Sequence, residues 1–527
     1  VDVDNRTKNY LSIPALRFLC ESINDLDNII KKKSSKLQIF YGKPKNVVKY
    51  IIKYLKTHKE YSNTKICLGF NQDYTKYSLE RDKEIEDICN KNSIDIFQNQ
   101  DDFTLCSMDI LKKLEAKTAY YSDIAQQIWG LAEMGYQEEQ SSALLQETLS
   151  AAGFKIATAV AGIPTAFTAE YGTEGPVIAI LGEYDALPGL SQKAVPNKES
   201  AGEKAGHACG HHLFGTASTA AAIAVKEWLE ANNKKGRIRF YGCPAEEGGS
   251  GKVYMVRAGL FEDVDIALHW HPGAKNAASA GAALANKYAK FRFYGVSALD
   301  GVEAMNNMVN MMREHVLEDA RIHYVITSGG KAPNVVPDYA EVYYYARHNK
   351  RDVVMDIFDR MVKAAEGAAL GTGTTMDYEI IGGTHELLPN LSLQEMVHKN
   401  LTKVGGVQYN EPELAFANTI AKTLGQENAD QETAAAIAPY KTTAKAGGST
   451  DVGDVSFTVP TVGFGTATWV PGTAAHSWQA VAAGGTNIGN KGMMVAAKTL
   501  SLSAIELFSN PKLIEAAKKE HRERLGT

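Results

Sequence analysis

Long hydrophobic runs are missing from this sequence of 527 residues, and no stretch approaches the ~18 apolar residues of a membrane span. The N-terminus, VDVDNRTKNY, has no cationic stretch followed by an apolar one, so we expect no secretion signal. An excess of positive charge is missing too, because 56 Lys and Arg face 61 Asp and Glu; this argues against a nucleic-acid or anionic-membrane partner. With only six cysteines, we expect no disulfide framework and a reducing, cytoplasmic location.

Alanine and glycine are scarce in the first part of the chain. Residues 1–110 hold one alanine, Ala15, and two of the 45 glycines, but 15 lysines and 10 asparagines. The rest of the chain is rich in alanine and glycine. This change of composition indicates two segments of separate origin, and we predict a domain boundary near residue 110.

Short apolar runs alternate with helical spacing in residues 1–110. We expect strands at 37–41 and 66–70 and helices at 47–55 and 78–89, which is typical of a parallel α/β layer. Through ALRFLCESINDLDNIIKKKSSKLQIFYGKP and FNQDYTKYSLERDKEIEDIC, the segment resembles a truncated, Rossmann-like N-terminal domain of the DNA photolyase family. The flavin-binding helical domain of that family has no counterpart downstream, so DNA repair is the least favoured function. We interpret the segment as a structural appendage or fusion partner, with chromophore or DNA binding as the alternative.

Metal-binding residue types follow the apolar strands of the second part. The strand PVIAIL leads into GEYDALPG, which places Asp185 just past a strand end, where ligands bind in open α/β sheets. The motif GHACGHHLFGTA then brings Cys209 and His211, whose spacing puts them on one side of an extended or turning backbone. A thiolate and an imidazole are a plausible metal-binding pair. We interpret the neighbouring His207 and His212 as packing or supporting residues.

Two adjacent carboxylates, Glu246 and Glu247, follow the next strand, RIRFYGC, in the motif PAEEGGSG. Side by side they are costly unless a cation lies between them or one is protonated. Because neighbours on an extended backbone point apart, one can bind a metal while the other reaches a metal-bound water. A third strand leads into LHWHP, where either His269 or His271 could be a ligand, and GTAAHSWQA adds His476. Four strand ends thus converge on the pattern of a two-metal hydrolytic site.

The order and wording of these motifs resemble the M20 family of metallopeptidases and amidohydrolases. The resemblance covers about residues 113–527 through LGEYDALPGL, HACGHH, PAEEGGSGK, WHP, GGKAPNVVPDYAEVYYYAR, GGSTDVGDVS and HSWQ. It implies a zinc-peptidase-like α/β catalytic domain formed by residues 111–283 and 390–527. It also implies an inserted ferredoxin-like α/β lid domain at 284–389, which supplies the dimer contact.

The resemblance further implies a role for each site residue. It places the metal ligands at Cys209, His211, Glu247, His271 and His476, the general base at Glu246, an orienting carboxylate at Asp185, and the substrate's carboxylate against Asn334 and Arg347 of the lid. A guanidinium can grip a carboxylate with two parallel hydrogen bonds, which suits Arg347 to this role.

The activity implied is hydrolysis of the amide bond of N-acyl or N-aroyl amino acids such as p-aminobenzoyl-glutamate. Two divalent ions, zinc or manganese, activate a water in that reaction, and the enzyme is a homodimer or heteromer through the lid. About a dozen residues that the family has between Ala298 and Leu299 are absent, including a histidine that stabilises the oxyanion, a contribution of ~10²–10³ in rate. Either this loop is deleted or the sequence lacks a segment of the natural protein. A catalytically impaired accessory or binding subunit is therefore the alternative.

Overall fold

The computed structural model describes residues 44–57, 67–71, 76–92, 95–99, 102–279, 281–443 and 448–527. The chain separates into two compact units, Val1–Cys106 and Ser107–Thr527. The described elements of the first unit are α3 (Pro44–Thr57), β1 (Cys67–Asn71), α4 (Lys76–Lys91) and β2 (Asp95–Asn99). The two strands pair in parallel, as expected of an α/β layer, and α3 packs on α4 through Ile52, Ile85 and Ile88. The strand predicted at 37–41 lies outside the described residues.

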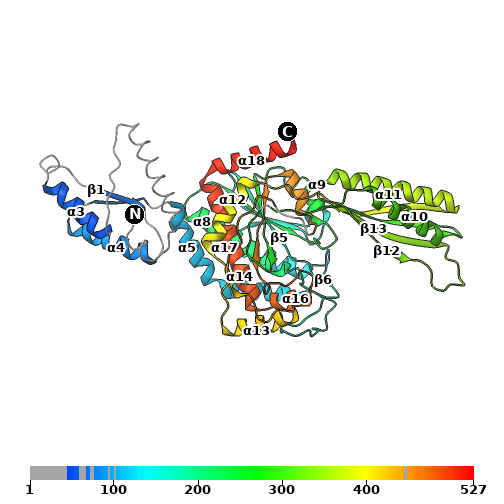
Figure 1. Cartoon of the computed structure of the whole chain (residues 1–527). Helices are drawn as coiled ribbons and strands as arrows, with labels where there is room; N and C mark the ends of the chain where they lie inside the picture. The colour runs from blue at the N-terminus through cyan, green and yellow to red at the C-terminus, as the bar shows by residue number, and fades with distance from the viewer. Residues whose placement is uncertain are drawn as a thin grey trace. The chain divides into compact units, whose positions relative to one another are not determined.

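A six-stranded sheet forms the centre of the second unit (Figure 1). Its strands, in spatial order, are β15 (Thr461–Val462), β9 (Ile266–Leu268), β5 (Val177–Glu183), β8 (Arg237–Cys243), β4 (Phe167–Tyr171) and β3 (Lys155–Thr158). The first four run parallel, and β4 and β3 are antiparallel to their neighbours. The carboxyl ends of β9, β5 and β8 therefore lie at one edge of the sheet, from which the metal-binding motifs continue.

Helices cover both faces of this sheet, which explains why β5 is apolar at nearly every position. Val177, Ala179 and Leu181 pack in a core shared with α9 (Gly251–Arg257) and α15 (Val452–Thr458). The alternate β5 residues face the long helix α8 (His211–Ala231), which packs in turn on α17 (Asn487–Ser509).

Helix α5 (Asp102–Ala116) runs across the limit between the two units. The further elements of the second unit are α6 (Thr118–Leu131), α7 (Glu139–Ala151), β6 (Leu187–Pro188), β7 (Ala205–Gly206), β10 (His271–Gly273), α12 (Leu391–Val404), α13 (Glu411–Thr423), α14 (Gln431–Ala435), β16 (Gly465–Ala467), α16 (Trp478–Gly484) and α18 (Pro511–Leu525). Among the described residues, no helix is long and apolar enough to cross a membrane.

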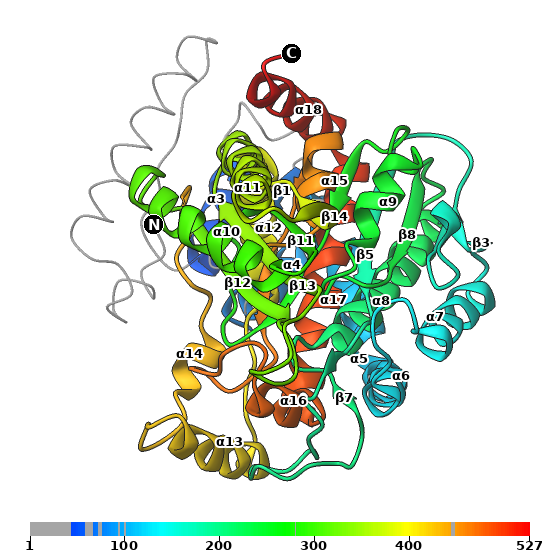
Figure 2. The same cartoon turned by 90° about the vertical axis from the view of Figure 1, so that its right-hand side faces the viewer.

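A second, antiparallel sheet is formed by a segment of the chain that is inserted between β9 and β15 of the first sheet. Its spatial order is β12 (Arg321–Ser328), β13 (Tyr339–His348), β11 (Ala285–Tyr294) and β14 (Thr375–Thr384). The helices α10 (Ala298–Met312) and α11 (Arg351–Thr372) lie side by side on one face (Figure 2) and share a buried core with Phe291 and Phe293. This β-α-β-β-α-β order with strands 4-1-3-2 is the ferredoxin-like arrangement that was expected. Ala298 and Leu299 both lie in the first turn of α10.

The fold class is thus confirmed: an M20-type α/β sheet with an inserted ferredoxin-like α/β domain. The exact domain limits at residues 110, 283 and 389 stay predictions.

Candidate functional site

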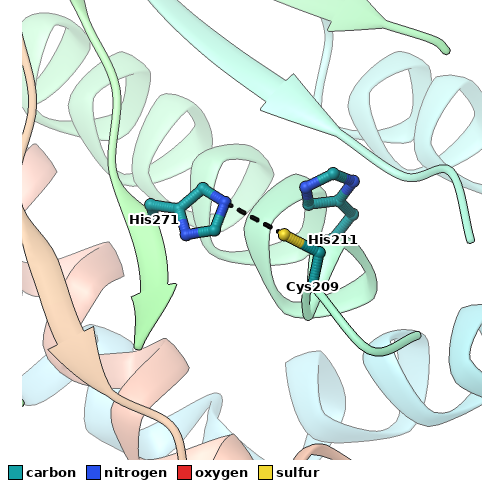
Figure 3. A group of neighbouring side chains, drawn as sticks. All are labelled: Cys209, His211 and His271. Carbon is teal, nitrogen blue, oxygen red and sulfur yellow. Dashed lines mark hydrogen bonds between the residues drawn. The ribbon is translucent and has the colours of Figure 1, made fainter. Parts of the chain in front are cut away.

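Cys209 and His211 are positioned by the turn that starts α8. Gly210 between them has a left-handed backbone (φ 76°), and a Cβ at this position would lie only 2.7 Å from Cβ of Pro272. Glycine therefore allows the turn to pack directly against the strand that carries His271. The Cys209 Sγ lies 3.4 Å from Nε2 of His271, and His211 stands beside them (Figure 3).

Hydrogen bonds fix the orientation of both imidazole rings. His211 Nδ1 donates to Asp185 Oδ1 at 2.8 Å, and the other oxygen of Asp185 accepts the Glu247 backbone N–H at 2.9 Å. His271 Nδ1 donates to the carbonyl oxygen of Pro272 at 2.7 Å. With Nδ1 engaged as a donor, Nε2 is the atom through which each ring, once deprotonated there, can bind a metal ion.

The two adjacent carboxylates sit on a turn with unusual backbone angles. Ala245, just before Glu246, has a left-handed backbone (φ 57°), and its N–H donates to the buried Glu138 carboxylate at 2.8 Å. Burial, and then the charge of Asp185, raises the pKa of Glu138 to about 7. His476 is also left-handed (φ 59°), and its Nε2 lies 3.2 Å from Glu247 Oε1. Two strained non-glycine residues at one place are typical of functional sites.

Potential ligand atoms form three overlapping groups, each with its atoms within 4.8 Å of one another. The groups are Cys209 with His211 and His271, Cys209 with Glu247 and His476, and His211 with Glu183 and Glu246. The first two contain between them all five predicted ligands and share Cys209. The structure therefore brings these five residues together, as two adjacent clusters.

Several buried polar atoms in this cluster lack a hydrogen-bond partner that would stabilise them. Among the described residues, Glu183 Oε2, His211 Nε2 and Glu247 Oε1 make no hydrogen bond of good geometry. Glu183 Oε2 nevertheless lies 3.1 Å from His211 Nε2, and Glu247 Oε1 lies 3.2 Å from His476 Nε2. Burial, and then the charges of Glu183 and Asp451, hold the pKa of Glu246 well above its usual range. Burial likewise raises the pKa of the Cys209 thiol. A cation would satisfy these atoms and reverse both shifts, so the donor set fits a divalent metal of borderline softness.

The remaining histidines of the motifs have other partners. His207 Nε2 bonds the carbonyl oxygen of Ile128 at 3.0 Å, and His212 Nε2 bonds that of Gly484 at 3.1 Å, consistent with packing roles. His269 lines the adjacent cavity but belongs to none of the ligand groups found among the described residues.

A cavity of about 1410 Å³ joins the cluster to the inserted domain. Its lining includes Glu246 and His271 on one side and Arg347 with Tyr288 and Tyr345 on the other. The two tyrosine rings stack at 4.3 Å, and the Arg347 guanidinium lies 5.1 Å from the centre of the Tyr345 ring. Arg347 Nε, although buried, has no hydrogen-bond partner in the described part of the chain, so this cation is available to a ligand.

The structure does not bring Asn334 to this cavity. Asn334 is exposed in the connection between β12 and β13, and it is not among the described residues that line the cavity. Its role as a carboxylate-binding residue stays a prediction.

Glu183, Lys252 and Asp451 are residues of the site that the motif analysis did not assign. Glu183 is the last residue of β5, and Lys252 Nζ lies 2.5 Å from its Oε1 and 2.7 Å from Asp451 Oδ1. The spacing of Glu183 and Asp185 carries a signal, since residues two apart on an extended backbone point the same way. The partner of Lys252 is 199 residues away, and no local pattern could have shown it.

The comparison with known proteins agrees with this geometry. Residues 179–480 match the family described as Peptidase family M20/M25/M40. One of the subunits of the p-aminobenzoyl-glutamate hydrolase of Escherichia coli is 43% identical over 450 residues, which cover 78% of this chain and 93% of that protein. The Xaa-Arg dipeptidase of Mus musculus is 29% identical, covering 76% of this chain and 88% of that protein.

Solved structures with the same fold include a dinuclear metal-binding peptidase of the M20 family from Bacillus subtilis (TM-score 0.54, 18% identity, 75% of this chain and 99% of that chain). An aminobenzoyl-glutamate utilization protein from Klebsiella pneumoniae is similar (TM-score 0.54, 17% identity, 75% and 97%). Residues 3–129 match the DNA photolyase family, which confirms the resemblance of the first segment and extends past the predicted boundary at residue 110. The match over residues 179–480 and the 43% identity to a hydrolase subunit together show that the chain belongs to peptidase family M20/M25/M40 and is a hydrolytic enzyme.

Proposed function

We propose that this enzyme hydrolyses the amide bond of N-acyl or N-aroyl amino acids, with p-aminobenzoyl-glutamate as the leading candidate substrate. One observation carries the proposal: the buried cluster of potential ligand atoms opens into a cavity that is also lined by Arg347, whose Nε has no hydrogen-bond partner among the described residues. The 43% identity to a p-aminobenzoyl-glutamate hydrolase of Escherichia coli supports the choice of substrate.

Two divalent ions fit the two clusters that share Cys209. One would be held by Cys209, His211 and His271, and the other by Cys209, Glu247 and His476. A Bacillus subtilis structure with this fold is described as dinuclear, which supports the number. A mixed set of sulfur, nitrogen and oxygen donors suits zinc, with manganese as the alternative. When bound, the ions supply a water of lowered pKa and a polarised amide carbonyl.

Glu246 is the general base in this proposal. It lines the cavity next to Glu247, and its carboxylate takes a proton from the attacking water and delivers it to the departing amide nitrogen. Burial, and then the neighbouring anions, raise the pKa of Glu246; bound cations would offset this and leave the carboxylate ionised for its role.

Arg347 and the stacked tyrosines would bind the two ends of the substrate, its amino-acid carboxylate and its acyl group. The guanidinium can bind the amino-acid carboxylate with two hydrogen bonds, and Asn334 would assist if the lid or a partner chain carried it to the site. The stacked rings of Tyr288 and Tyr345 offer an apolar wall beside the cavity that suits an aromatic acyl group.

An accessory binding role within a larger assembly is the second candidate function. The Escherichia coli relative is named as one subunit of its hydrolase, which favours assembly with another chain, and a homodimer through the lid is the other arrangement. The oxyanion-stabilising histidine that the family has before α10 is also missing from this sequence. In this case the cavity would bind an acyl amino acid without cleaving it.

An assay of the purified single chain separates the two candidates. We expect release of p-aminobenzoate from p-aminobenzoyl-glutamate, complete loss of turnover after chelation and dialysis, and recovery when zinc or manganese is added. A metal-loaded chain that binds this substrate without turnover, in a calorimetric titration, would instead establish the accessory role.

Glu246→Gln tests the general base. The amide keeps the shape of the side chain but takes no proton, so we expect kcat to fall by about 10²–10⁴. Metal content by elemental analysis should stay at the wild-type value, because Glu246 is not one of the proposed ligands. Turnover within about tenfold of wild type would refute the assignment.

Arg347→Lys tests recognition of the carboxylate. Loss of the bidentate grip should raise KM about 10–100-fold, corresponding to roughly 1.5–3 kcal/mol for a hydrogen bond to a charged group. An analogue without the α-carboxylate should show the same KM with either enzyme. Arg351→Lys is the matched control, since Arg351 is on the same domain but half exposed and outside the described cavity lining. Equal effects of the two substitutions would contradict the role.

A further inference from the structure

Glu183 is a fully buried carboxylate whose two oxygens have different surroundings. Its side chain is 1% exposed at the carboxyl end of β5, and it lines the cavity next to the metal cluster. Lys252 Nζ contacts Oε1 at 2.5 Å, whereas Oε2 has no hydrogen-bond partner within the described ranges. The free oxygen lies 3.1 Å from Nε2 of His211.

Two potential ligand atoms therefore lie close together in a buried place, without a hydrogen bond between them among the described residues. His211 Nδ1 is engaged with Asp185, so Nε2 is the ring atom that faces Glu183 Oε2, as an ion pair while it is protonated and as a ligand once a metal replaces the proton. A proton between the two atoms would need hydrogen-bond geometry, and neither atom has such a partner in the described structure. A metal ion bound by both atoms would not lie on the line between them, so it does not require the alignment of a hydrogen bond. Two ligands at about 2.0–2.2 Å from one tetrahedral ion lie roughly 3.3–3.6 Å apart, slightly more than the 3.1 Å between these two atoms.

Lys252 and Asp451 hold Glu183 in the position that such binding requires. Asp451 accepts both the Lys252 side chain, at 2.7 Å, and its backbone N–H, at 2.8 Å. All three side chains are at most 1% exposed, so the lysine has a fixed position and engages a single oxygen of Glu183. The other oxygen, Oε2, is thereby held in place next to His211, where it can bind a metal ion.

We propose that Glu183 is a further metal ligand, which binds through Oε2 the ion held by His211 and is oriented by the buried Lys252–Asp451 pair. The inference rests on the proposed metal-dependent function and adds an oxygen donor to the five predicted ligands. The ion at His211 would then gain a carboxylate oxygen from Glu183. The third ligand group joins His211 and Glu183 with Glu246, which keeps its proposed role as the general base.

Metal binding by Glu183→Gln tests the proposal without relying on activity. Glutamine keeps an oxygen for Lys252 but removes the anionic donor, so we expect about tenfold or more weaker binding of one of two ions, measured by competition with a chromophoric chelator. The visible absorption of the cobalt-substituted protein should change, because the number of ligands at one ion changes. Glu183→Asp, which withdraws the carboxylate by one methylene, should give an intermediate affinity.

Glu413→Gln is the matched control. It removes a similarly buried carboxylate, paired with Lys491 at 2.6 Å, outside the metal cluster, and should leave the affinity and the cobalt spectrum unchanged. If both Glu183 variants fold, by circular dichroism, and bind two ions with wild-type affinity and spectrum, Glu183 is only the ion partner of Lys252. Both Glu183 variants could fail to fold without metal while wild type and Glu413→Gln fold. The variants are then refolded with cobalt: a changed cobalt spectrum supports Glu183 as a ligand, and a wild-type spectrum contradicts it. A wild-type chain that binds no ion would refute the proposed function itself.

Discussion

Buried ligand atoms that lie close together without hydrogen bonds of good geometry are the constraint on which this site depends. The Nε2 atom of His211 and the Oε2 atom of Glu183 are 3.1 Å apart and unpartnered among the described residues, and the buried thiol of Cys209 lies next to His271. Each buried polar group left unpaired costs about 1–3 kcal/mol, so a fold that gathers several of them is favourable only when something cationic joins them. Metal binding and the stability of this edge of the sheet are therefore linked in our account.

Strand ends and supporting hydrogen bonds, rather than the metal itself, position these groups. Parallel strands end at a common edge, and β5 can carry a carboxylate at its last position because helices cover its apolar residues on both faces. Asp185 connects His211, at the start of α8, to the backbone of Glu247, after β8, so two ligands from different elements are tied to one side chain. The fully buried Trp270 donates from Nε1 to the carbonyl oxygen of Phe214, which ties the strand of His271 to the first turns of α8. Such supporting bonds set the ligand geometry before an ion arrives.

Much of the fold and of the site was predictable from the sequence, because the signals are local. Apolar strands followed by Cys, His or Glu identified the strand ends, and the spacing of Cys209 and His211 put both in one cluster. Local signals could not choose between His269 and His271, and the family resemblance made that choice. Glu183 was not predicted because it ends an apolar run, and the Lys252–Asp451 pair depends on a contact across 199 residues. Patterns within a segment carry no information on such long-range pairs. Nor do they show whether the connection that carries Asn334 reaches the cavity.

Anomalous X-ray diffraction from crystals of the zinc-loaded protein, collected on both sides of the zinc edge, tests the central claim most directly. The account predicts two anomalous peaks that share Cys209 Sγ as a neighbour at about 2.3 Å, with His211 Nε2 and Glu183 Oε2 at about 2.0–2.2 Å from the same peak. A map without peaks at the ends of β5, β8 and β9, or with one peak that lies away from Cys209, would contradict it.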